Sequence, residues 1–164
     1  MIQGTVKFIA AAVIACALQA PAFAQTNCIE LKTTGEVEKE VVNAKGEKSK
    51  VLVAAADSKV VPGTEVIWTV TASNVCKQPS DNVVITNPVP EHMTLVPGSV
   101  LGVGADVTFS LDGKAFAPAG KLTVTENGAT RAARAEEYRH VRWQFKNPIP
   151  AGSSAFGRFR ATLN

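Results

Sequence analysis

Two stretches rich in strand-forming residues, bounded by turn residues, constrain this chain more than any other feature. Residues 66–74 are apolar at every second position, with Ile67 the one exception. Side chains alternate sides along a strand, so this spacing buries one face and leaves the other in water. Residues 83–86 are almost continuously β-branched, which is typical of a strand packed in a sandwich or buried on both faces. Pro62 and Gly63 precede the first run, and Pro88 ends the second because proline has no N–H for a ladder. The pattern predicts an all-β sandwich.

Further alternating segments predict about 7–9 antiparallel strands in total. Beside the two runs above, the expected strands cover residues 28–32, 36–42, 50–53, 106–111, 122–125, 140–145 and 158–163. The turn residues at 43–47 make a hairpin of 36–42 and 50–53. Residues 129–138 are expected to be a loop or a short helical turn. The expected core residues are Val66, Trp68, Val70, Val83, Ile85, Trp143 and Phe159.

The order of these motifs resembles a known bacterial family. The resemblance rests on Pro62-Gly63-Thr64-Glu65-Val66 with Trp68, Val70 and Asn74, then Asn82-Val83-Val84-Ile85-Thr86-Asn87-Pro88-Val89-Pro90, then Met93-Thr94-Leu95-Val96-Pro97-Gly98-Ser99. Together they are similar to the "conserved repeat" domain, catalogued as domain of unknown function eleven. The resemblance implies an immunoglobulin-like sandwich on a secreted or cell-surface protein. It places that domain at residues 60–164, in a single copy, with residues 25–59 as an N-terminal strand and hairpin extension of the sandwich.

The first 24 residues have the features of an export signal. Lys7 supplies a positive start, residues 8–18 are apolar, and Ala22-Phe23-Ala24 forms a small-x-small cleavage site before Gln25. An alternative is a lipobox at residues 13–16, which would leave Cys16 as a lipidated N-terminus. Either way we expect an exported chain that is periplasmic, on the cell surface or secreted. After cleavage no apolar run is long enough to span a membrane.

Two cysteines, Cys28 and Cys76, remain after cleavage at Ala24. An oxidising compartment favours a disulfide between them. It would join the new N-terminus to the end of the strand at 66–74. The alternative, a redox-active pair, is disfavoured because the two residues lack Cys-x-x-Cys spacing.

All arginines lie at or after Arg131 in a chain of formal net charge +3. If the strands at 140–145 and 158–163 pair antiparallel, Arg142, Arg158 and Arg160 share one wet face. Such a patch would suit an anionic polymer or an acidic partner, since guanidinium groups bind phosphate and carboxylate. The alternative is an ordinary solvated sheet face. The mild charge gives no indication of nucleic-acid binding.

No motif in the sequence assembles a reaction centre or a cofactor site. His92 and His140 have no metal-ligand spacing, and no nucleophile elbow, phosphate loop or dinucleotide fingerprint occurs. No ligand pattern supports calcium, and no pattern selects a Lys–Asn crosslink. We therefore expect a non-enzymatic structural or interaction module of the bacterial envelope, with an unidentified envelope protein or anionic polymer as partner. One alternative is a subunit of a surface assembly that donates an edge strand, either 36–42 or the strand at Cys28. A second alternative is a hydrolase on a sandwich scaffold.

Overall fold

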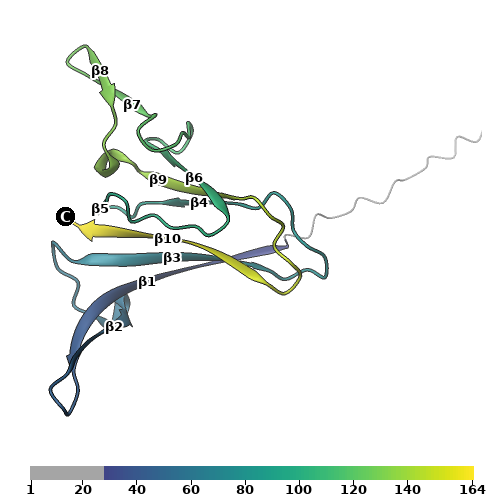
Figure 1. Cartoon of the computed structure of the whole chain (residues 1–164). Coiled ribbons are helices and arrows are strands. Elements are labelled where there is room, and N and C mark those ends of the chain that lie inside the picture. The colour runs from purple at the N-terminus through teal and green to yellow at the C-terminus, as the bar shows by residue number, and fades with distance from the viewer. Residues whose placement is uncertain (1–27) are drawn as a thin grey trace, which may run out of the picture.

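The computed structural model describes residues 28–164, which form two sheets packed face to face and a separate hairpin (Figure 1). The predicted leader and Cys16 lie outside the described residues. The strands are β1 (Ile29–Val42), β2 (Lys48–Ala54), β3 (Glu65–Asn74), β4 (Val84–Pro88), β5 (Met93–Leu95), β6 (Ala105–Ser110), β7 (Thr123–Glu126), β8 (Ala129–Ala132), β9 (His140–Phe145) and β10 (Ser154–Leu163). Two short 3₁₀ turns are η1 (Ala55–Asp57) and η2 (Ala135–Glu137). The predicted all-β sandwich is confirmed.

The larger sheet has the order β2-β1-β3-β10-β5 and the smaller one β4-β9-β6, with every pair antiparallel. Strands β7 and β8 form the separate hairpin. The described residues therefore contain ten strands, eight of them in the two packed sheets, where about 7–9 strands were expected in total. Figure 1 shows the smaller sheet above the larger one, with the β7–β8 hairpin projecting at the top and the end of β1 curving away at the bottom.

The core lies between the inner faces of the two sheets and centres on Trp143 of β9 and Phe159 of β10. Both side chains are fully buried, and their ring centroids are 6.3 Å apart. The indole N–H of Trp143 donates to the carbonyl oxygen of Leu101 at 2.9 Å, so the buried ring leaves no polar atom unpaired. Trp68 is half-buried and packs against this cluster, and the other expected core residues are buried. The expected core is confirmed.

Strands β9 and β10 do not pair with each other, so the condition for a shared arginine face is not met. β9 lies at the centre of the smaller sheet and β10 lies in the larger one. The segment between them crosses from one sheet to the other, with Ile149 buried at the crossing and bridged to Ser80. Pro148 and Pro150 flank Ile149 and have no N–H to continue a ladder, so the corner cannot close as a hairpin.

Strand β1 merges two predicted strands into one long element. Its first half, Ile29 to Glu36, pairs with β3, and its second half, Glu36 to Val42, pairs with β2. The predicted hairpin is thus confirmed, and we call residues 37–54 the arm. Beyond its root the arm extends past the sandwich (Figure 1). Both halves of β1 pair with strands of their own chain, and donation of an edge strand to a neighbour stays a prediction.

The predicted Cys28–Cys76 disulfide is present. It joins the residue before β1 to the loop after β3. The amide of Asn74, 1% exposed, closes the same end: it donates to the carbonyl oxygens of Gln78 and Ile149, each at 2.8 Å, and its oxygen accepts from the Cys76 N–H at 3.0 Å. The end of β3 is therefore fixed by one covalent bond and a buried polar network.

Candidate interaction surface

The arm carries a concentration of exposed apolar side chains. At its root, Val37 is buried and Val53 is half-buried against the core. Further out, four large apolar residues are exposed to between 37% and 60%: Val41, Val42, Val51 and Leu52. A two-stranded hairpin with no sheet beneath it is only marginally stable in water. These side chains therefore remain available to pack against another surface.

The two faces of the arm differ in character. Ion pairs of Glu40 with Lys48 at 2.8 Å and of Glu38 with Lys50 at 3.1 Å cross the strands on the outer face. The cross-strand partners Val37 and Val53 begin the inner face, which continues through Val41 and Val51 and carries Lys39 as its charged residue. Since side chains alternate along each strand, the inner face is an apolar strip that extends the core outward.

Arg160 of β10 holds the arm in a fixed direction relative to the sandwich. Its guanidinium lies 2.7 Å from a carboxylate oxygen of Glu38 on the arm and 3.5 Å from one of Glu65 on β3. The hydrogen bond from Arg160, followed by that from Lys50, lowers the pKa of Glu38. The carboxylate therefore stays ionised at neutral pH, and the arm is attached to the body by both backbone pairing and charge.

The predicted patch of Arg142, Arg158 and Arg160 does not form, because β9 and β10 lie in opposite sheets. Arg142 projects from the outer face of the smaller sheet, where it stacks on Phe116 at 3.4 Å and donates to the Thr86 hydroxyl. Arg158 and Arg160 flank the buried Phe159 along β10, so both lie on the outer face of the larger sheet. There the Arg158 guanidinium donates to the Thr69 hydroxyl at 2.9 Å. Arg142 therefore lies on one outer face of the sandwich, and Arg158 and Arg160 lie together on the other.

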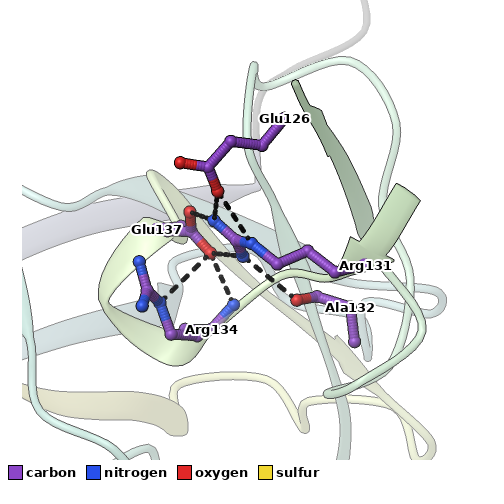
Figure 2. Close-up of polar contacts among 5 residues, drawn as sticks. All are labelled: Glu126, Arg131, Ala132, Arg134 and Glu137. Carbon is purple, nitrogen blue, oxygen red and sulfur yellow. Dashed lines mark hydrogen bonds and ion pairs between the residues drawn. The ribbon is translucent and has the colours of Figure 1, made fainter. Parts of the chain in front are cut away.

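A second polar feature fixes the β7–β8 hairpin, with Arg131 of β8 at its centre (Figure 2). The guanidinium donates to Glu137 at 2.7 and 2.8 Å, to Glu126 at 3.0 and 3.1 Å, and to the Ala132 carbonyl oxygen at 3.2 Å. Glu137 also accepts from the backbone N–H of Arg134 at 2.7 Å. The cluster therefore ties both strands of the hairpin to η2.

Beside this cluster, η2 forms one wall of an apolar pocket of about 320 Å³. It lies where the sandwich opens between β5 and β6, and it is lined by Leu95, Gly98, Val100, Val107, Phe109, Ala119, Ala135 and Tyr138. The rings of Phe109 and Tyr138 stack with centroids 4.6 Å apart, and the Tyr138 hydroxyl accepts from the Gly120 N–H. The Tyr138 hydroxyl in this wall is thus already bonded, and the pocket offers mainly apolar contact.

Arg131→Gln should change the titration of Glu137. Arg131, with help from the Arg134 N–H, lowers the pKa of Glu137 from 4.5 to about 2. Because the folded-state pKa is lowered, the contribution of this carboxylate to stability is present above pH 4.5 and is lost as the pH falls towards 2. In the variant, carboxyl carbon NMR should show the pKa of Glu137 returning towards 4.5.

The matched control for this experiment is Arg134→Gln, since its side-chain nitrogen lies 3.8 Å from Glu137 and its backbone N–H survives the change. That variant should shift the pKa of Glu137 much less. Equal shifts in the two variants would contradict the central place given to Arg131.

Ser110, Asp112 and His140 bring together the residue types of a hydrolytic triad, but their bonding is different. Ser110 is opposite His140 in the β6–β9 ladder and is fully buried. Its hydroxyl pairs with the Asp112 carboxylate at 3.1 Å and accepts from the Gly113 N–H at 2.9 Å. Backbone N–H groups of Lys114 and Ala115 lower the pKa of Asp112. Ser110 and Asp112 brace a turn, Nδ1 of His140 has no hydrogen-bond partner among residues 28–164, and a buried hydroxyl cannot reach a substrate carbonyl.

The sequence contained one signal of the arm surface that alternation alone did not reveal. Val41-Val42 and Val51-Leu52 are adjacent apolar pairs inside an otherwise charged hairpin. A strand with one dry face would carry a polar residue at one position of each pair. Adjacent apolar pairs therefore place apolar side chains on both faces of the arm.

Comparisons of the chain with protein-family profiles, with curated proteins and with solved structures find no match. The resemblance to the conserved repeat domain therefore stays a prediction from motifs. Over residues 28–164 no group of three or more His, Cys, Asp or Glu side chains is placed to hold a metal ion. In the same part of the chain, no helix has the length and apolar character needed to span a bilayer.

Proposed function

We propose that the protein is an exported, non-enzymatic module of the bacterial envelope that binds another protein through its arm. The observation that carries this proposal is the set of exposed apolar residues Val41, Val42, Val51 and Leu52 on a hairpin anchored only at its root. Interfaces between proteins bury such apolar side chains at their centre, with polar residues at the rim. The arm has this composition, with ion pairs beside its apolar strip.

A protein partner is favoured over an anionic polymer. Lysine and glutamate nearly balance on the arm: Lys39, Lys45, Lys48 and Lys50 stand against Glu38, Glu40 and Glu47. Balanced and paired charges create little net field to attract a polyanion. They help to select among protein partners, because a wrong partner would place like charges together.

Export is supported by the predicted leader and by the disulfide, since disulfides persist in oxidising compartments. The motif resemblance to conserved repeat domains, with their immunoglobulin-like sandwiches, agrees with a place in the envelope. Protein purified from producing cells should have the intact mass of a chain that begins at Gln25. A full-length chain in the cytoplasm would contradict export, and a lipid on Cys16 would replace the predicted cleavage site.

Replacing a valine of the apolar strip by aspartate should weaken partner binding strongly. Val41→Asp and Val51→Asp each place a charge where the partner would exclude water, and the expected loss of affinity is at least tenfold, or about 1.4 kcal/mol. Affinity capture from the envelope fraction, followed by titration with the captured protein, measures the effect.

The control for this experiment is Thr125→Asp, at a position that is also exposed, on the β7–β8 hairpin. It should leave binding unchanged, and thermal unfolding should show all three variants folded. Capture of the same proteins with the same affinity by the wild type and the arm variants would overturn the proposal.

A further inference from the structure

The first half of β1 is an open edge of the larger sheet. Residues 29–36 pair with β3 on one side, and β2 fills the other side only from Glu36 onward. After Ala54, opposite Glu36, the chain turns away through η1. Within residues 28–164 no strand lies beside residues 29–35 on that side. An open edge of this kind is a template for pairing with another chain.

The backbone hydrogen bonds show which groups face the open side. The Val75 N–H donates to the Cys28 carbonyl oxygen at 2.9 Å, so the polar groups of Cys28 point towards β3. The direction alternates along an antiparallel strand, and therefore the N–H and C=O groups of Ile29, Leu31 and Thr33 point outward. Asn43 is an odd-numbered residue like these three, and its N–H donates to the Glu47 carbonyl oxygen on the β2 side. This bond agrees with the assignment.

The side chains at this edge are apolar on the inner face and charged on the outer face. Leu31 is 57% exposed and lines a groove together with Ile29, Val83, Val84 and residues 80–82. Glu30 and Lys32 flank Leu31 on the opposite face, and both are exposed. The edge therefore offers backbone groups, an apolar residue and one charge of each sign within three positions.

We propose that the occupant of this edge is a second copy of the chain, paired antiparallel about a two-fold axis at Leu31. Leu31 then lies opposite Leu31 of the second copy, and Ile29 opposite its Thr33, so that the outward N–H and C=O groups of these three residues are bonded. Glu30 lies opposite Lys32 of the second copy, and Lys32 opposite its Glu30. The contact is self-complementary, as a two-fold interface must be.

The charges select this register over its neighbours. The next register in one direction places Lys32 opposite Lys32, and the next in the other direction places Glu30 opposite Glu30. Like charges directly opposite in a sheet are destabilising, and opposite charges are stabilising. A register shifted by a single residue is excluded too. It would place the outward-pointing N–H and C=O groups of one copy opposite residues of the other copy whose N–H and C=O groups already bond β3.

The pairing joins two five-stranded sheets into one continuous sheet and places the two Leu31 side chains beside the grooves that contain Val84. A contact of this size belongs with weak interfaces of about 1,200 Å² or less, so dimers should become abundant near ~1 mM protein. The arm lies at the other end of β1 and stays uncovered. The inference is therefore independent of the function proposed for the arm.

Charge reversal tests the proposal with its own control. In Glu30→Lys, and equally in Lys32→Glu, both charge pairs become repulsive, and the dimer dissociation constant in analytical ultracentrifugation should rise about tenfold or more. The double variant Glu30→Lys/Lys32→Glu restores both pairs and should dimerise like the wild type. A mixture of the two single variants should form a heterodimer, because every pair across it is again opposite in charge.

Glu30 and Lys32 are both exposed in the single chain, so the variants should fold, and circular dichroism verifies that they do. A wild type that is monomeric at about 1 mM would overturn the proposal. That result is the one expected if a different protein, and not a second copy, covers the edge. A dimer whose dissociation constant ignores both single reversals would overturn it as well, since it would use another surface.

Discussion

Gly157→Ala is expected to destabilise the protein by about 3 kcal/mol. Gly157 of β10 faces Trp143 across the core, and an alanine Cβ there would lie 2.9 Å from Cε3 of the indole and closer still to Cδ2 and Cε2. The ring is fully buried and has little room to withdraw, because Gly102 lies against its pyrrole edge, where a Cβ would be 2.9 Å from Nε1. Urea unfolding of the mature chain measures the change in the free energy of unfolding.

The comparison variant is Gly35→Ala, another strand glycine that faces a tryptophan. There the nearest atom is Cζ3 of Trp68 at 3.0 Å, and Trp68 is only half-buried, so its ring can move. The expected cost is below about 1 kcal/mol. A Gly157→Ala protein as stable as Gly35→Ala would contradict the packing of Trp143 between the two sheets.

Removing the disulfide should cost about 4 kcal/mol, the second large effect. The bond joins residues separated by 48 positions, and on the chain-entropy account the cost follows from the freedom that the unfolded chain regains. Cys28→Ser/Cys76→Ser should therefore unfold at a lower urea concentration than the wild type. The Asn74 network beside the bond should keep the native end of β3 in place.

A reducing agent provides the internal control for this prediction. It should lower the stability of the wild type to that of the double serine variant and leave the variant itself unchanged. Equal stability of the oxidised and reduced wild type would mean that the crosslink does not constrain the unfolded chain.

The sandwich could be predicted from the sequence because its apolar residues follow the period of a strand. Val66, Val70, Ile85, Trp143 and Phe159 all lie where alternation places them. The Cys28–Cys76 pairing followed equally directly, since these two cysteines are the pair that the predicted cleavage would leave. Local periodicity and cysteine count were sufficient for these features.

The assignment of strands to sheets could not be predicted in the same way. Alternation gives the face of each residue but not the neighbouring strand, so the pairing of residues 140–145 with 158–163 could only be assumed. Ile149 is buried where the chain crosses between sheets, and this crossing separates Arg142 from Arg158. A surface patch made of residues from two strands requires that the strands lie side by side. The arginine patch does not form because β9 and β10 do not.

The exposed apolar surfaces of the arm and of the β1 edge could not be predicted from the sequence for a related reason. Exposed apolar residues such as Val84 and Leu52 look like core in a sequence, and only the limits of the neighbouring strands leave them uncovered. The β2 strand ends opposite Glu36, which exposes the edge at Leu31, and the arm extends beyond β3. Both features follow from where ladders stop, which is a property of tertiary structure.

Site-specific photo-crosslinking in the producing cells tests most directly whether the arm is the partner-binding surface. A photoreactive side chain at position 51 should give one dominant product with an envelope protein, and the same group at position 125 on the β7–β8 hairpin should give none. Equal yields from the two positions, or no product from position 51, would contradict this account.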